Sequence, residues 1–376
     1  MRLRPIITGL ALCLLLLRPQ FAQSSQEMRR ELGELAKGIK GYLDSRNAES
    51  IAMGQFTGPA NFPTSAGPGL VQVLTEELQK LKVSVKTRAE YGLKGEYRLT
   101  EVPAENMDDA RLGKKVLALK IQAAIEDSFG NKQLDVDFQR TIRGADGVAG
   151  MVGLTASLDP RGTEVERDRE LRKQLTDPKP SIKTSVIRSR PDSPCGIELI
   201  VNDQPREATE KDGLAYVGIT RGETYGVRVF NDSDQEMAVQ LQIDGLSMYC
   251  FSEVRYTEGP RKGDPRYTAV IIAPRKSVTI YGWHVNNEKT DKFMVMEYAK
   301  SAAGSLNHTT NLGTITASFQ ASWPEGEPAP KDEPGRARGP GSGDATGFGP
   351  RIDQKFQEVK RNLGVIRDVV SVRYTK

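Results

Sequence analysis

Residues 213–283 contain a series of short apolar segments separated by turn residues, and this series constrains the fold more than any other feature of the chain. Apolar and polar residues alternate within the segments, and Gly, Asn, Asp and Pro separate them at short intervals. Such regular punctuation is typical of a β-sandwich. The segments expected to form strands are 213–219, 225–231, 237–243, 267–272 and 277–283.

The chain before residue 158 mixes helical and strand patterns. Apolar residues three and four apart predict helices, whereas alternating or wholly apolar runs predict strands. Residues 127–131 separate two alternating runs and predict a hairpin turn. The expected helices are 26–44, 70–81 and 145–158, and the expected strands are 49–56, 83–85, 91–102, 116–125 and 134–142.

These patterns predict a mixed α+β fold class with an N-terminal α/β sandwich domain followed by an all-β sandwich domain. Residues 164–175 are dense in Glu and Arg and predict a solvated helix. The four prolines that follow, between residues 178 and 194, predict a connection without regular elements. The alternating run 365–374 predicts a final strand that returns to the sandwich, since a lone strand cannot bury its own apolar face. The expected divisions are 1–23 signal peptide, 26–158 α/β domain, 159–194 charged linker, 195–324 β-sandwich, 325–350 flexible loop rich in Pro and Gly, and 351–376 returning strand.

The first residues have the pattern of an export signal. Arg2 and Arg4 precede the apolar run Ile6–Leu17, which is too short to span a bilayer of about 30 Å. Cys13 is not expected to be lipidated, because the bulky Leu12 precedes it. We therefore expect a periplasmic or secreted protein of the bacterial cell envelope.

The charge balance changes when the signal is removed. Its three arginines account for most of the formal charge of +4, and without them the charge is +1. A nearly neutral chain gives no electrostatic reason to expect a nucleic-acid partner. No other apolar stretch predicts a transmembrane helix in the mature chain.

Cys195 and Cys250 are the two cysteines that follow the signal. In an oxidising compartment they could form one disulfide. They could equally be two unpaired, buried small hydrophobic residues. The sequence leaves both alternatives open, because a bridge depends on a geometry that spacing does not supply.

A resemblance to known domains covers roughly residues 28–145. The segment Ile51–Phe56, the helix 70–81, the strand that begins at Val83 and the run Gly95–Leu99 resemble the periplasmic domain of CsgG-like curli-assembly proteins, penicillin-binding-protein activators and TolB N-terminal domains. The resemblance implies an α/β fold that contacts other envelope proteins. The C-terminal half is similar to β-sandwich domains of uncharacterised bacterial envelope proteins.

Residues with catalytic or metal-binding chemistry are few. His284 and His308 lie in no metal-ligand spacing, and the loop 58–69 lacks the Gly-Lys-Ser/Thr of a phosphate-binding loop. Asp232, Asp234 and Asp244 fit turns better than a calcium cage. We therefore expect no catalytic residue, no cofactor and no bound metal.

The expected function follows from the signal and the scarcity of reactive groups. We expect a non-catalytic envelope protein that binds an envelope protein or a surface polymer, and oligomers are possible. A component of a secretion or pore-like assembly is the first alternative. A hydrolase that uses His284 or His308 is the second.

Overall fold

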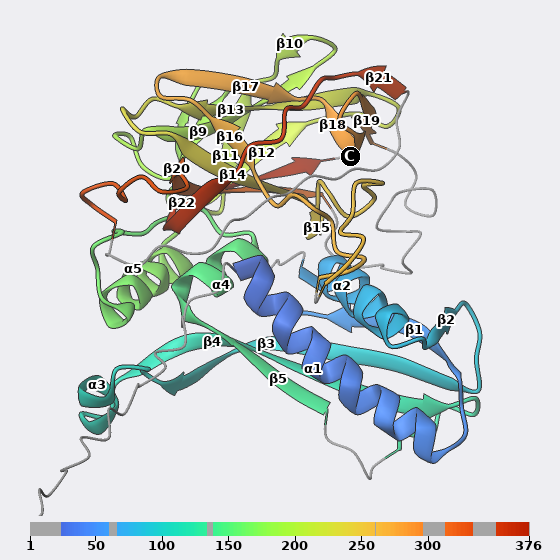
Figure 1. Cartoon of the computed structure of the whole chain (residues 1–376). Helices are drawn as coiled ribbons and strands as arrows, with labels where there is room; N and C mark the ends of the chain where they lie inside the picture. The colour runs from blue at the N-terminus through green and yellow to red at the C-terminus, as the bar shows by residue number, and fades with distance from the viewer. Residues whose placement is uncertain are drawn as a thin grey trace, which may run out of the picture.

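The chain has a mixed α+β fold in which strands predominate (Figure 1). The computed structural model describes residues 24–59, 66–133, 138–259, 261–295, 313–333 and 351–375. The expected export signal, His308 and residues 334–350 lie outside these ranges. The helices are α1 Ser24–Ser45, α2 Ala66–Lys80, α3 Met107–Arg111, α4 Gly144–Val152 and α5 Glu164–Thr176.

A sheet covered by helices on one face forms the first part of the structure (Figure 1). Its strand order is β2-β1-β3-β4-β5, and we call it the helix-backed sheet. Leu32, Leu35 and Ile39 form a buried stripe on α1, which packs with α2 and α4 over the same core. The strands are β1 Ser50–Thr57, β2 Ser84–Lys86, β3 Tyr91–Pro103, β4 Lys115–Asp127 and β5 Phe138–Arg143.

Two larger sheets enclose a second core. The β13 sheet comprises β7 Ser181–Lys183, β8 Val186–Arg188, β9 Cys195–Val201, β10 Gln204–Pro205, β13 Thr224–Asn231, β17 Lys276–Ile280, β18 Gly282–Asn286, β19 Lys289–Met294 and β21 Arg351–Asp353. The β22 sheet comprises β6 Ala156–Ser157, β11 Ala208–Lys211, β12 Leu214–Gly218, β14 Met237–Ile243, β15 Leu246–Ser247, β16 Val270–Ile272, β20 Thr314–Pro324 and β22 Arg361–Thr375. Alternate side chains of both sheets fill the space between them.

Strand β22 joins the two cores. It lies between β12, to which it is parallel, and β20, to which it is antiparallel. The expected final strand therefore lies inside the β22 sheet. Val369 packs in the core beneath the helices, whereas the next residue, Val370, packs between the two sheets. Side chains alternate along a strand, so one strand supplies both cores.

The segment 159–194 contains the helix expected over residues 164–175, which is α5. Its proline-rich part is not irregular throughout, because the hairpin β7–β8 lies within it and extends the β13 sheet through β9. Pro178, Pro180 and Pro191 lie outside these elements, so they remove no ladder hydrogen bond. Leu171 of α5 is fully buried, so this helix packs against the fold instead of lying free in solvent.

Three other expectations differ from the structure at element ends. The helix expected at 145–158 ends where Gly153 adopts a left-handed conformation (φ 64°), and the chain then forms β6 against β22. Helix α2 begins within the expected loop 58–69, because Pro68 is tolerated in a first helical turn. The described start of the expected flexible loop is fixed, since Glu333 is buried against Arg367 at 3.0 Å.

Candidate functional site

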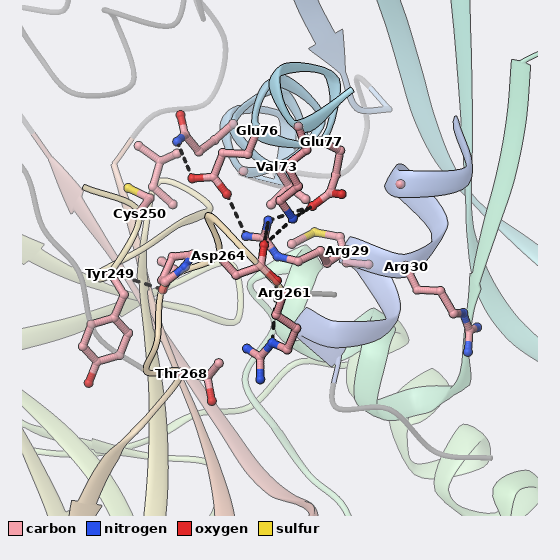
Figure 2. A pocket seen from close by; sticks show the side chains of 18 of the residues that line it. Arg29, Arg30, Val73, Glu76, Glu77, Tyr249, Cys250, Arg261, Asp264 and Thr268 are labelled. Atoms are coloured by element: carbon pink, nitrogen blue, oxygen red, sulfur yellow. Dashed lines mark hydrogen bonds and ion pairs between the residues drawn. The ribbon is translucent and has the colours of Figure 1, made fainter. Parts of the chain in front are cut away.

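A cleft of about 810 Å³ lies where the helices meet the β22 sheet (Figure 2). Helices α1 and α2 form one wall, and β14, β15 and the β15–β16 loop (residues 248–269) form the other. We call it the seam cleft. Its volume lies within the range of about 300–1,000 Å³ that is usual for ligand sites, and such sites often lie where two parts of a fold meet.

Arg29 stands at the centre of the cleft wall. It reaches from α1 to Glu76 (2.8 Å) and Glu77 (3.0 Å) on α2, and to Asp264 (3.2 Å) on the β15–β16 loop. Figure 2 shows these carboxylates converging on its guanidinium. Burial opposes the charge of Arg29, but Glu76 and Asp264 outweigh that cost and raise its pKa. Three parts of the chain are thus joined by one cation.

Further cations complete this ionic cluster, which we define as Arg29, Glu76, Glu77, Lys80, Arg255, Arg261 and Asp264. Lys80 pairs with Glu77 at 2.7 Å and also with Asp264, while Arg255 reaches Glu76 at 3.3 Å. Arg261 lies 3.6 Å from Asp264. Four cations therefore face three carboxylates, and the charges of the wall are largely neutralised by one another.

Close backbone packing fixes the two walls relative to each other. A β-carbon on Gly69 of α2 would lie 2.1 Å from the carbonyl oxygen of Gly245, far inside van der Waals contact. Only glycine allows α2 to approach the β14–β15 turn this closely. The neighbouring Asp244 accepts hydrogen bonds from the amides of Gly313 and Thr314, and this holds the turn in place.

The floor of the cleft contains a buried polar group that the protein does not satisfy. Gln240 on β14 is 6% exposed, and its Nε2 has no hydrogen-bond partner among the described residues. The hydroxyl of Thr268, across from β14, is likewise buried without a partner in the described part of the chain. Leaving such a group unpaired costs about 1–3 kcal/mol, so a group that pairs with Gln240 would recover part of that energy.

Some polar groups farther along the same sheet are satisfied. The hydroxyl oxygens of Ser371 on β22 and Thr316 on β20 lie 3.0 Å apart, within hydrogen-bond distance. The backbone amide of Ser371 also donates to the hydroxyl of Thr155. These side chains lie under the α4–β6 connection. Other buried polar atoms of this sheet lack partners among the described residues, including the amide of Gln320 on β20 and Nε of Arg367 on β22, so such atoms are not confined to the cleft.

The two cysteines expected to pair or to be buried are both buried and free. Cys195 begins β9, and Cys250 lines the seam cleft. Burial raises the pKa of both thiols well above the usual value, so both stay protonated at neutral pH. The structure thus corresponds to the second of the two alternatives, and neither thiol is activated as a nucleophile.

His284 is completely buried in the two-sheet part of the fold. Its Nδ1 lies 3.3 Å from the hydroxyl of Ser252, and the rings of Tyr267 and Phe356 pack edge-on against it. Burial lowers its pKa to about 4, although a hydrogen bond with Asn287 opposes the shift. A histidine with so little affinity for a proton, beside a serine that is also buried, is a poor general base.

The buried histidine predicts a measurable dependence of stability on pH. The folded pKa of His284 lies below the unfolded value of about 6.5, so the unfolded chain binds more protons between these values. Stability is therefore lost as the pH falls, and we expect a loss of about 1 kcal/mol between pH 7 and 5.5. Urea unfolding of the wild type and of His284→Gln at several pH values would measure this loss. If the free energy of unfolding fell equally with pH in both proteins, His284 would not be the group responsible.

The other residues considered from the sequence are separated in space and have structural partners. Asp232 pairs with Arg188 at 2.6 Å and Asp234 pairs with Arg275 at 2.8 Å, each at a turn. Among the described residues, no three His, Cys, Asp or Glu side chains gather as a metal site would require. Trp283 packs in the core between the two sheets.

The sequence did not reveal the seam cleft. Arg29, Glu76 and Asp264 are far apart in the chain, and each fits a solvated helix face or a turn. One signal was present. Residues 248–269 form a long connection between two strands and carry many charges. Connections of this length within a domain usually have a function.

Comparison with known proteins supplies no relative: no family model, no curated protein and no solved structure matches the chain. Among the helices described, none is both long and apolar enough to cross a membrane.

Proposed function

We propose that this chain is a non-catalytic, exported protein of the bacterial cell envelope that binds a protein segment or a surface polymer in the seam cleft. In this proposal the helix-backed sheet and the two packed sheets act as two domains, and the ligand lies between them. Export is inferred from Arg2, Arg4 and the apolar run that follows them.

The observation that carries the proposal is the cleft floor. An interface that served only to hold two parts together would be expected to satisfy its buried polar groups. Gln240 lines an open cleft and has no partner for its Nε2 among the described residues. This nitrogen has almost no accessible surface, so a ligand reaches it only if the amide of Gln240 turns toward the cleft. In this proposal that contact accounts for a polar side chain in this position.

The reactive side chains support binding over catalysis. His284 is buried with a pKa of about 4, and the thiol of Cys250 is held protonated by burial, which raises its pKa. The carboxylates of the cleft, including Glu76 and Asp264, are paired with arginines. Groups held in this way position a ligand more readily than they transfer a proton.

A role in a larger envelope assembly is the second candidate. Three large apolar side chains are strongly exposed at hairpin ends of the helix-backed sheet: Met107 (68%), Leu112 (73%) and Phe129 (89%). Asp127 accepts hydrogen bonds from the amides of Phe129 and Asn131, and these bonds fix the backbone of the turn that carries the exposed ring. Light scattering over a wide concentration range tests this candidate, and a monomer throughout would reject it.

Capture from envelope extracts tests the cleft proposal. Gln72 is partly buried on α2 and lines the cleft, so Gln72→Trp fills part of the space. We expect the immobilised wild-type protein to retain a specific protein or polymer from the extract. Gln72→Trp should retain at least about tenfold less of it, which corresponds to a loss of about 1.4 kcal/mol of binding free energy.

The matched control is Gln122→Trp, which places the same ring on the opposite side of the molecule. Gln122 lies on β4, on the face of the helix-backed sheet that the helices leave uncovered, since its neighbours Ile121 and Ala123 point into the helical core. This variant should retain the species as the wild type does. Equal capture by wild type and Gln72→Trp would overturn the proposal.

A further inference from the structure

We propose that two arms of the β15–β16 loop, residues 253–259 and 261–266, form a lid on the seam cleft, and that ion pairs with α1 and α2 hold this lid closed. We call these residues the lid hairpin. The lid opens when the pairs are screened by salt or broken by substitution. The inference rests on the proposed function, because it concerns access to the same cleft, but the movement is measured without a ligand.

The lid hairpin is held together by its own bonds. The backbone amide of Tyr256 donates to the carbonyl of Asp264 (3.0 Å), and the amide of Gly263 donates to the carbonyl of Tyr256 (2.8 Å). The guanidinium of Arg261 lies over the ring of Tyr256, 4.5 Å from its centroid. The two arms therefore stay joined when the hairpin moves as one body.

Apolar packing does not fix the lid hairpin to the rest of the molecule. In the part of the chain that the structure describes, neither hydrophobic core includes a side chain from residues 253–259 or 261–266. The core between the two sheets includes Tyr249 and Cys250, which lie just before the hairpin. Segments with few buried apolar contacts are the ones that open locally while the fold stays intact.

Ion pairs join the lid hairpin to the helices. Asp264 pairs with Arg29 of α1 at 3.2 Å and also with Lys80 of α2, and Arg255 pairs with Glu76 of α2 at 3.3 Å. Figure 2 shows Asp264 meeting Arg29 from the opposite wall. The three cations are 22–31% exposed, so salt reaches them. The Debye length falls from about 10 Å at 0.1 M salt to about 3 Å at 1 M, and high salt therefore weakens these pairs.

Asp264 has the largest share in this closure. It is the one carboxylate that the lid hairpin brings to the ionic cluster, whereas Arg255 and Arg261 are the two cations that it brings. Without this carboxylate, two cations of the hairpin would face Arg29 and Lys80 of the helices, and like charges repel. We therefore expect Asp264→Asn to open the lid even at low salt.

The two native thiols distinguish opening of the lid from unfolding. Cys250 lines the cleft at the base of the hairpin and is buried, and its carbonyl accepts a hydrogen bond from Nη2 of Arg255 at 2.7 Å. A movement that draws Arg255 away uncovers this thiol. Cys195 is fully buried on β9, outside the cleft, so it reacts only when the sheets themselves come apart.

Labelling with N-ethylmaleimide tests the lid on the intact protein without ligand. This reagent is uncharged, so salt does not change its attraction to the protein. Peptide mapping by mass spectrometry reads each cysteine separately. We expect Cys250 to react at least about tenfold faster at about 1 M NaCl than at about 0.05 M, with Cys195 unreactive in both. Equal rates for Cys250 at the two salt concentrations would overturn the proposal.

Asp264→Asn should label Cys250 at low salt at least as fast as the wild type does at high salt, and its rate should then change less than about twofold with salt. Asp234→Asn is the matched control. It breaks an ion pair with Arg275 that lies at an exposed turn, and it should behave as the wild type does. Slow labelling of Cys250 in Asp264→Asn would also reject the lid.

The remaining outcomes are equally distinct. Labelling of Cys195 and Cys250 in parallel as salt rises would show unfolding of the whole molecule and would overturn the lid. If Asp264→Asn alone unfolds, the salt series on the wild type decides. Because no ligand is present, failure of the lid leaves the cleft proposal intact, and capture by wild type against Gln72→Trp decides that proposal separately.

Discussion

Replacing Arg29 with methionine is expected to lower the free energy of unfolding by about 3 kcal/mol. The change removes the one cation that contacts Glu76, Glu77 and Asp264 together, and all three carboxylates are at most 13% exposed. Breaking a buried ion pair from one side costs about 3–5 kcal/mol. We expect the lower end, because Lys80 and Arg255 remain beside the carboxylates. Urea unfolding at pH 7 measures the change.

Arg30 provides the matched control on the same helix. Its side chain is 61% exposed, and within the described part of the chain it pairs with Glu27 and Glu31 of the same helix. Figure 2 shows it turned away from the cluster. Arg30→Met should change stability by less than about 0.5 kcal/mol. If Arg29→Met cost no more than this control, the ionic cluster would not hold the two parts of the fold together.

Ending the chain at Lys360 is expected to abolish cooperative folding. The truncation removes β22, which pairs with β20 from Thr314 to Pro324 and with β12 on its other side. It also removes Val369 from one core and Val370 from the other. The loss exceeds the whole stability of about 5–15 kcal/mol that is usual for a domain. Near-ultraviolet circular dichroism should show no fixed tertiary structure.

A point change at the start of the same strand is the control. Arg361 is partly exposed and pairs with Glu236 at 2.7 Å, so Arg361→Ala should cost about 1 kcal/mol or less and leave the transition cooperative. Adding a synthetic peptide of residues 361–375 to the truncated chain should restore folded structure. A truncated chain that unfolds cooperatively by itself would contradict a central role for β22.

Much of the fold could be predicted because local patterns agree with it. The stripe of Leu32, Leu35 and Ile39 predicted α1, and alternation predicted the hairpin of β4 and β5. The hairpin β7–β8 within residues 178–194 was not predicted, because prolines that lie between elements cannot be distinguished in the sequence from prolines that interrupt them. The partners of β7 and β8 are strands that follow them in the chain, so their pairing is not a local property.

The candidate site could not be predicted in the same way. Arg29 and Glu76 are ordinary charged residues on amphipathic helices, and Gln240 is one polar residue in an alternating strand. Their importance comes from burial, and burial depends on what covers a strand's second face. Here the helices cover the outer face of β14, so Gln240 lies in a seam instead of in water.

The sequence by itself determined that strands predominate, where most strands lie, and that histidines and cysteines are few. Periodicity carries this information, because it is a property of neighbouring residues. Tertiary structure alone decided that β22 belongs to both cores, that both cysteines remain free, and that a neutralised ionic cluster faces an unpaired amide across a cleft. These features depend on contacts between residues far apart in the chain, and no local pattern specifies such contacts.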